Sequence, residues 1–287
     1  MTVPMCLAPF SEQAPASFVI PANACDTHAH VISPDTQAYP FVADRTYTPP
    51  PADEGQYLKM LDEQGMQRGV LVQISVYGKD NRYMLHVLRR HPKRLRGVAV
   101  VDAEVSDTEL ESMHEAGVRG VRLNVLFKGG VGFDEMERLA HRIKDYGWHM
   151  QFLMDVSQLP ELMPMMMRLP VPGVLDHMGH SPAAQIASTE GGRAMLDLLQ
   201  HHGWWVKLSG AYRVSDRFDD FADVTPWAQT LVETAPERCL WGSDWPHVHI
   251  PKMVDTGKLR NQFAAWVPDD ALRRQILVEN PARLYDF

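Results

Sequence analysis

The sequence predicts an α/β protein made of a single (β/α)₈ barrel of the TIM type, with an extended N-terminal arm and a C-terminal helix. The first observation behind this prediction is that short, apolar, β-branched runs alternate with segments of helical periodicity. Such an alternation indicates a parallel sheet with helices on its faces. The second observation is the length of 287 residues, since one such barrel takes about 250 residues. A doubly wound sheet is the main alternative, but no G-x-G-x-x-G sequence follows the first predicted strand.

The predicted elements run from an arm to a closing helix. Residues 1–23 contain several prolines and no sustained periodicity, so we expect an extended arm there and the barrel over residues 24–287. The predicted strands are the apolar runs 25–32, 69–74, 95–101, 118–126, 148–154, 171–177, 204–208 and 238–241. The predicted helices are 55–64, 83–90, 107–116, 133–146, 159–167, 191–201, 225–234 and the C-terminal 269–284. Glycines that suit left-handed C-caps follow several helices: Gly65, Gly117, Gly147 and Gly203.

The composition excludes several classes of protein. Hydrophobic residues make up 45% and charged residues 22%, which is ordinary for a globular protein. We find neither an apolar run of the roughly 20 residues that span a bilayer nor a basic, then apolar, secretory signal. The net charge of -8 argues against non-specific binding of nucleic acid. The three cysteines are scattered along the chain and form no C-x-x-C pair; they are Cys6, Cys25 and Cys239. We therefore expect a cytoplasmic enzyme with reduced thiols.

Two histidines end the first predicted strand, in the segment Asp26-Thr27-His28-Ala29-His30. Side chains alternate along a strand, so His28 and His30 share one face with Asp26. Two imidazoles at this spacing can hold one metal ion or polarise one carbonyl oxygen. A pair of partly buried histidines bonded to the backbone would give the same spacing, so the motif alone leaves both interpretations open.

Two further polar motifs follow the eighth and sixth predicted strands. In the segment 242–247, Asp244 could accept a proton from an attacking water, or it could cap the turn before Pro246. In the segment 176–180, His177 could point into the barrel mouth, whereas we expect His180 to be a loop or helix-capping residue. Because active residues of such barrels gather at the C-terminal ends of the strands, the three motifs together predict one shared site.

Together these motifs resemble the amidohydrolase superfamily, and the resemblance extends from Asp26 to the segment 280–285. Segments 72–81, 119–124, 176–179 and 241–247 are similar to those of the 2-pyrone-4,6-dicarboxylate lactonases and related lactone hydrolases. The resemblance implies that Asp244 activates water and that His28, His30 and His177 polarise a lactone carbonyl. It also implies six substrate-binding positions: Tyr47, Ser75, Arg122, Lys128, Arg213 and His247. The two arginines among them suit bidentate binding of a carboxylate.

Two departures from this family concern the substrate. Lys128 replaces a second arginine and Leu153 replaces an aromatic hydroxyl, so we expect an acidic lactone without assigning it to the pyrone. Neither a lysine nor a glutamate stands in the fourth strand at 121–124, and His149 lies at the start of the fifth. Metal-dependent members of the superfamily usually have such ligands in these two strands, and the resemblance to the lactonases implies hydrolysis without an obligatory metal. We therefore expect no required metal or other cofactor. If a metal does bind, we expect a single zinc ion on His28, His30, His177 and Asp244.

Other functions of such a barrel stay open at this stage. They are a metal-dependent, non-oxidative decarboxylase of aromatic or muconate-type acids, a lactone isomerase, and a barrel that only binds acidic metabolites. The expected partner is a small acidic lactone, with neither nucleic acid nor membrane, and a homo-oligomer is left open.

Overall fold

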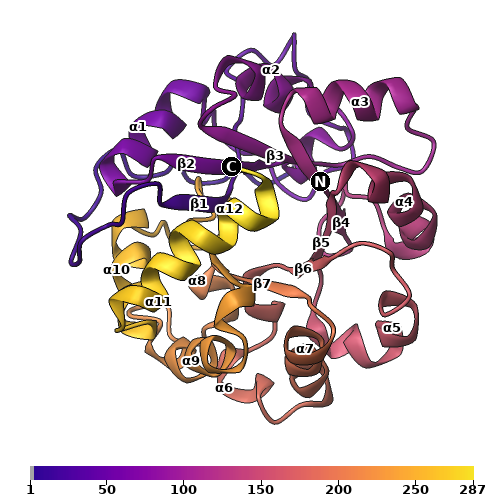
Figure 1. The fold of residues 1–287 in the computed structure, drawn as a ribbon. Helices are drawn as coiled ribbons and strands as arrows, with labels where there is room; N and C mark the ends of the chain where they lie inside the picture. The colour runs from indigo at the N-terminus through magenta and orange to yellow at the C-terminus, as the bar shows by residue number, and fades with distance from the viewer. Residues whose placement is uncertain (1–2) are drawn as a thin grey trace.

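The structure is a computed structural model that describes residues 3–287. Eight parallel strands form one sheet in the order β1 to β8, and the sheet curls into a nearly closed barrel (Figure 1). The predicted fold is therefore confirmed. The strands are β1 Cys25–Ala29, β2 Arg68–Val72, β3 Leu95–Ala99, β4 Val118–Asn124, β5 His149–Leu153, β6 Gly173–Leu175, β7 Trp205–Leu208 and β8 Cys239–Trp241.

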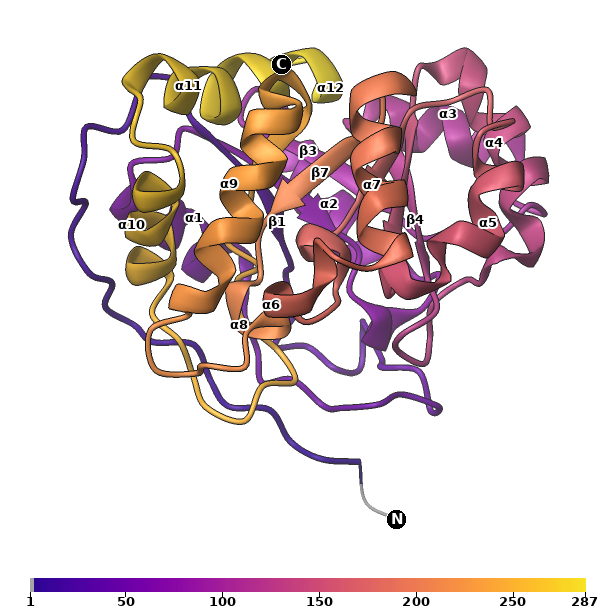
Figure 2. The same ribbon diagram turned by 90° about the horizontal axis from the view of Figure 1, so that it is seen from below.

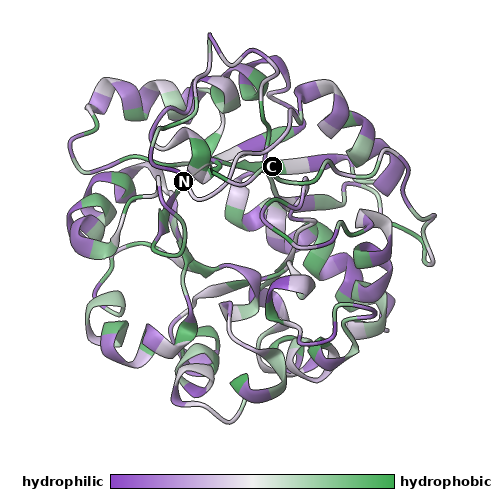
Figure 3. Ribbon diagram, turned by 180° about the vertical axis from the view of Figure 1, so that it is seen from behind, coloured by the Kyte–Doolittle hydropathy of each residue, from purple (hydrophilic) through white to green (hydrophobic). Residues whose placement is uncertain are grey.

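The helices surround the barrel, with hydrophobic residues toward the strands and hydrophilic residues on the outside (Figure 3). The helices are α1 Glu54–Gln64, α2 Arg82–Arg90, α3 Asp107–Glu115, α4 Met136–Ile143, α5 Leu159–Met166, α6 Ala183–Ile186, α7 Glu190–His201, α8 Ala211–Val214, α9 Thr225–Thr234, α10 Thr256–Trp266, α11 Asp270–Arg274 and α12 Asn280–Tyr285. Caps begin several of them; Asp53 and Gln56, for example, form a capping box at α1. Over residues 3–287, no helix has the length and apolar character needed to span a membrane.

The barrel closes where β1 meets the segment that follows β8. The backbone N–H of Asp244 donates to the carbonyl of His28 at 2.8 Å. The buried carboxylate of Asp26 accepts from the N–H of Ser243 at 2.8 Å and from its hydroxyl at 2.6 Å. We call these four residues the seam. The segment after β8 therefore closes the barrel and, through Asp244, also reaches the predicted site.

Apolar side chains fill the end of the barrel where the strands begin. The C-terminal helices α11 and α12 lie across this end, whereas long loops and the start of the N-terminal arm lie at the opposite end, and the arm runs along the side of the barrel between the two ends (Figure 2). Arg96, at the start of β3, donates to the carbonyls of Tyr285 and Asp286 and so holds the C-terminus in place. A buried cluster at this end, which we call the apolar plug, contains Cys25, Val70, Val72, Val98, Val174, Trp205, Leu240 and Tyr285.

The N-terminal arm is bonded to the barrel at several points. The N–H of Cys6 donates to the carbonyl of Thr48 at 2.9 Å. The N–H of Ala14 donates to Asp255 at 3.1 Å, and its carbonyl accepts from the fully buried Arg260 at 2.9 Å. Residues 3–23 contain no helix.

Some predicted element boundaries were wrong. The helix α10 was missed, because its buried face includes Thr256 and Arg260 and the apolar spacing is therefore diluted. The first strand ends at Ala29 instead of continuing to residue 32, since Ile32 pairs with Ala52 in a separate antiparallel bridge. The sixth strand covers only Gly173–Leu175 instead of 171–177, so His177 lies in a turn after it.

Candidate active site

Polar side chains from several strands meet at the C-terminal end of the barrel. His28 lies on β1, Arg122 on β4 and Lys207 on β7, while His177 and Asp244 follow β6 and β8. All five side chains are buried. The structure thus brings the three predicted histidines and the predicted aspartate into one group, in the place that the strand order requires.

The three imidazoles face the carboxylate of Asp244. Its Oδ1 lies 3.8 Å from Nε2 of His28 and 3.6 Å from Nε2 of His30. Its Oδ2 lies 4.0 Å from Nε2 of His177. These separations exceed hydrogen-bond lengths, so the four groups face one another without bonding directly.

The second oxygen of Asp244 is held by strong donors. Its Oδ2 accepts from Nε of Arg213 at 2.6 Å and from the hydroxyl of Tyr212 at 2.7 Å. Burial opposes ionisation of this carboxyl, but the guanidinium of Arg213 outweighs it and keeps the pKa of Asp244 well below its usual value. Burial also raises the pKa of Tyr212, so its hydroxyl stays protonated and donates. Asp244 is therefore ionised, with one oxygen fixed and the other facing the histidines.

The outer ring nitrogens of two histidines have partners of their own. Nδ1 of His30 lies 2.7 Å from the carbonyl of Val72, which can only accept. Nδ1 of His30 therefore carries a proton, and Nε2 faces the site. Nδ1 of His177 lies 2.9 Å from the hydroxyl of Ser209. Burial lowers the pKa of His28 to about 3 and lowers that of His177 well below its usual value, so both imidazoles are neutral.

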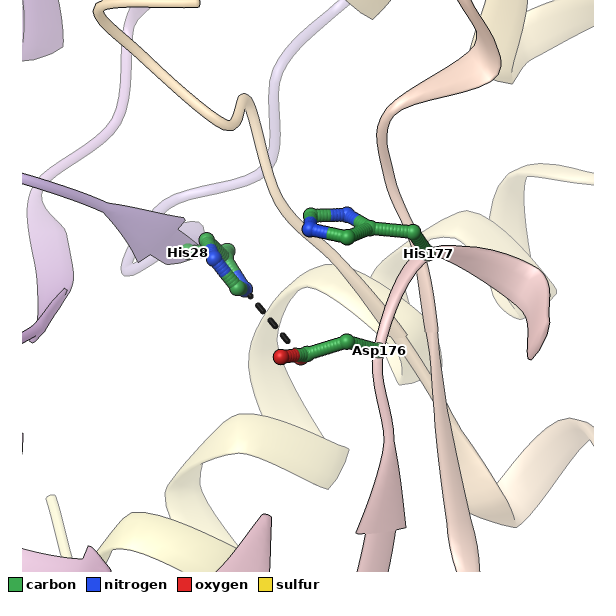
Figure 4. A group of neighbouring side chains, drawn as sticks. All are labelled: His28, Asp176 and His177. Atoms are coloured by element: carbon green, nitrogen blue, oxygen red, sulfur yellow. Dashed lines mark ion pairs between the residues drawn. The ribbon is translucent and has the colours of Figure 1, made fainter. Parts of the chain in front are cut away.

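A second buried carboxylate, Asp176, lies on the other side of His28 (Figure 4). Its Oδ1 is 3.3 Å from Nδ1 of His28, while Oδ2 accepts from Nε of Arg122 at 3.2 Å and from Gln151 at 3.0 Å. Burial opposes its charge, but the neighbouring His28 and the cations of Arg122 and Lys207 keep the pKa of Asp176 well below its usual value. The site therefore contains two ionised carboxylates, one on each side of the same imidazole.

Two residues of the site have left-handed backbone conformations. The φ angle is 48° at His177 and 61° at Asp244. Such conformations cost about 1–3 kcal/mol and persist where the surrounding structure holds them, often at functional sites. Gly210 packs directly against His177, since a Cβ atom at Gly210 would lie 2.9 Å from Nδ1 of that ring. The turn after β6 and the turn after β7 thus fix the ring of His177 together.

The group can hold a divalent metal ion. Ligand atoms of His28, His30 and Asp244 lie within 4.8 Å of one another, and so do those of His28, Asp176 and His177. Among the described residues, Nε2 of His28 and Oδ1 of Asp244 are buried without a hydrogen-bond partner. Buried imidazole and carboxylate groups with such unpartnered atoms suit zinc. The first group fits better, because the cations that contact Asp176 would repel an ion in the second.

The predicted carboxylate-binding cations occupy different depths. Arg122 is buried and Arg213 is partly buried, and both bond the two carboxylates through Nε, which leaves their terminal nitrogens to other partners. Nη2 of Arg213 reaches the carbonyl of Val248 at 3.3 Å. Lys128 is exposed and bonds Asp44 at 2.8 Å. The structure tests none of the predicted substrate contacts, and they stay predictions.

The remaining predicted contacts lie at the rim and behind the base. The hydroxyl of Tyr47 lies 3.0 Å from that of Ser75, and the Tyr47 ring stacks on His249 at 5.3 Å. His247 has both ring nitrogens within hydrogen-bond distance of hydroxyls, at 3.0 Å from Tyr212 and 2.8 Å from Thr256. His247 therefore braces Tyr212, which in turn bonds Asp244.

Several residues of the site were missed from the sequence. Tyr212 bonds the predicted base, and Lys207 and Gln151 contact each other and the surroundings of His28. The sequence did contain a signal for Lys207. A lysine within the apolar strand Trp205–Leu208 is expected to be buried, and a buried ammonium group needs a partner. Asp176 stood in a recognised motif but had been given no role.

This fold and this site define the amidohydrolase class. The chain belongs to the amidohydrolase family, whose sequence profile matches residues 25–287. It is 37% identical to a 4-sulfomuconolactone hydrolase of Rhizobium radiobacter, over 99% of this chain and 96% of that protein. It is 36% identical to a 2-pyrone-4,6-dicarboxylate hydrolase of Comamonas testosteroni, over 96% of this chain and 94% of that protein.

A solved apo structure from Agrobacterium tumefaciens has the same fold. It superimposes with a TM-score of 0.84 at 26% identity and covers 96% of this chain and 99% of its own. The predicted family, with its resemblance to lactone hydrolases, is confirmed.

Proposed function

We propose that this protein hydrolyses a carboxylate-bearing lactone, with Asp244 as the base and the histidines as the groups that hold the carbonyl. One observation carries the proposal: Oδ2 of Asp244 is fixed by Arg213 and Tyr212, while Oδ1 faces the imidazoles of His28 and His30. A carboxylate held in this way can accept a proton only on the side where the carbonyl would lie.

The reaction uses water as the nucleophile. Asp244 takes a proton from a water molecule through Oδ1 while the water oxygen bonds to the carbonyl carbon of the lactone. Hydrogen bonds from the site to the carbonyl oxygen stabilise the negative charge that develops there. The ring C–O bond then breaks, and the proton on Asp244 passes to the departing ring oxygen. The product carries a new carboxylate and a new hydroxyl.

The substrate class follows from the cations and from the relatives. The relatives' names describe a dicarboxylate and a sulfonated lactone, both of them anionic. In this chain, Arg122 and Arg213 use Nε internally, so their terminal nitrogens can form a fork on a substrate carboxylate. Lys128 at the rim adds a mobile point charge. An acidic lactone fits this arrangement, with its carbonyl inside and its carboxylate toward the arginines.

We propose that hydrolysis needs no metal, because the imidazoles, Arg213 and Asp244 supply the required donors and base. A zinc ion held by His28, His30 and Asp244 would supply extra polarisation of the carbonyl. We place the enzyme in the cytoplasm, where its thiols stay reduced. In support, Cys25 and Cys239 are buried free thiols, and Cys6 is free and partly buried.

A lactone panel tests the proposal. Protein stripped with chelator, and checked by elemental analysis, is incubated with pyrone dicarboxylates, muconolactones and sugar-acid lactones in a pH indicator. Ring opening releases a proton, since the new carboxylic acid ionises at neutral pH. We expect proton release on acidic lactones at a rate that added zinc changes little. Isomeric products without proton release, zinc-dependent release of carbon dioxide, or tight binding without turnover would each select a different function.

A further inference from the structure

A buried lysine that the proposed reaction does not use lies beneath His28. Lys207 is fully buried on β7. Its Nζ donates to the carbonyl of Thr27 at 2.8 Å and to Oε1 of Gln151 at 2.7 Å. It also lies 3.4 Å from Nδ1 of His28. An ammonium group has three N–H donors and no acceptor, so when it is buried each N–H group requires an acceptor.

The charge on Lys207 has a nearby counter-charge. Oδ1 of the buried Asp176 lies 4.0 Å from Nζ, in a region from which water is excluded. A buried ammonium is maintained by such a carboxylate together with acceptors for its protons. Because an ammonium cannot accept a hydrogen bond, Nδ1 of His28 is the acceptor in its hydrogen bond with Lys207. The single ring proton of the neutral His28 then resides on Nε2.

The alternative partner for Nδ1 of His28 is Asp176 itself. Its Oδ1 lies 3.3 Å from Nδ1 in an ion-pair contact that would require a proton on Nδ1 (Figure 4), but within residues 3–287 this contact lacks the geometry of a hydrogen bond. His30 provides the contrast, because its Nδ1 faces a backbone carbonyl and must donate. The two histidines of the first motif therefore carry their protons on opposite nitrogens.

We propose that Lys207 is a positioning residue that holds His28 with its proton on Nε2, so that His28 donates a hydrogen bond to the lactone carbonyl. This inference rests on the proposed function, in which that carbonyl lies among the imidazoles. It also separates two uses of the site. To ligate zinc, Nε2 of His28 must be free of its proton, so the same hydrogen bond from Lys207 opposes metal binding.

The tautomer is measured directly on the wild-type protein. Two-bond ¹H–¹⁵N spectra of protein with ¹⁵N-labelled histidine distinguish a protonated ring nitrogen from one with a lone pair. The signals are assigned with His28→Gln and His30→Gln. We expect Nε2 to be protonated in His28 and Nδ1 in His30. This measurement requires no turnover, so it can fail while lactone hydrolysis holds, and the reverse is also true.

A pair of variants then isolates the lysine. In Lys207→Met we expect the proton of His28 to move to Nδ1, facing Asp176. Zinc affinity, measured by competition with a chromogenic chelator, should rise by about 10- to 100-fold. Metal-free kcat should fall by about 10²- to 10³-fold, as when one donor to a developing oxyanion is removed. Arg122→Met is the matched control, because it removes the other buried cation beside Asp176 without touching His28.

Two results would overturn the inference. One is a wild-type His28 with its proton on Nδ1. The other is a Lys207→Met protein whose tautomer and zinc affinity equal those of the wild type, or whose changes in tautomer and zinc affinity also occur in Arg122→Met. If Lys207→Met does not fold, the wild-type spectrum decides the question alone.

Discussion

The two ends of the barrel bury very different side chains. At the end where the strands begin, the apolar plug is closed by Tyr285 and covered by α12. At the opposite end, the interior holds ionised Asp176 and Asp244 with the cations that pair with them. Buried charges destabilise a protein unless they are paired and hydrogen-bonded, whereas buried apolar surface stabilises it.

Stability and chemistry are therefore separated along the barrel axis. A substitution in the apolar plug should change the free energy of unfolding and leave the reaction unaffected. A substitution among the buried charges should change the reaction more than the stability of the remaining fold. The predictions below test this separation from both ends.

The largest effect should come from Asp244→Asn. The amide cannot act as the base, so kcat should fall by about 10²- to 10⁴-fold while the circular dichroism spectrum stays unchanged. Initial rates on the best acidic lactone measure the loss. A variant that keeps nearly the wild-type kcat would remove Asp244 from the mechanism.

At the other end, Trp205→Ala should act on stability alone. Trp205 is buried in the apolar plug, and its truncation should lower the free energy of unfolding by about 3–5 kcal/mol, as for other large aromatic residues. Urea titration measures the loss, and kcat per folded molecule should equal the wild-type value. A reduced kcat in fully folded protein would show that the two ends are coupled.

Removing the arginines should separate substrate binding from structure. Arg122→Ala and Arg213→Ala should each lose about 1.5–3 kcal/mol in kcat/KM on acidic lactones, the usual cost of a hydrogen bond to a charged group. With Arg122→Ala, kcat/KM on neutral lactones should fall less than kcat/KM on acidic lactones. With Arg213→Ala the two should fall by nearly the same amount, because Arg213 also holds the base. Equal losses on both substrates with Arg122→Ala would make Arg122 a structural residue.

The smallest effect should come from Asp255→Ala at the arm. Asp255 caps α10 through the N–H groups of Gly257 and Lys258, and it accepts from Ala14 of the arm. Losing a cap costs about 0.5–2 kcal/mol, which thermal unfolding would detect. Asp53→Ala, at the cap of α1, is the control without an arm contact. A larger loss for Asp255→Ala would measure what the arm adds, and equal losses would show that it adds nothing.

Most of the fold was predictable because each strand and helix carries its pattern locally. The helices α6, α8 and α10 were missed. The longest of them, α10, shows the limit of that reasoning, since its buried Arg260 is satisfied by the carbonyl of Ala14, distant in the sequence. An apolar pattern cannot encode a polar residue whose partner lies on another segment.

The same limit applies to the site. His28, His30 and Asp244 stand in short motifs and were identified, and the structure places them together. Tyr212 and Lys207 were missed, because their importance arises from contacts across the barrel that no local spacing reveals. Lys207 on β7 reaches the carbonyl of Thr27 on β1, 180 residues earlier in the chain.

The seam has a consequence for engineering this barrel toward new substrates. Ser243 closes the barrel through its N–H and hydroxyl on Asp26, and Asp244 does so from a left-handed backbone conformation that few residue types adopt easily, so a library that varies both would lose folded members together with inactive ones. Randomisation is better directed at Tyr47, Ser75 and Lys128, which lie on other loops. Clones from such a library would differ in selectivity while the ring of strands stays closed, so that a screen for new activity would not be dominated by misfolded protein.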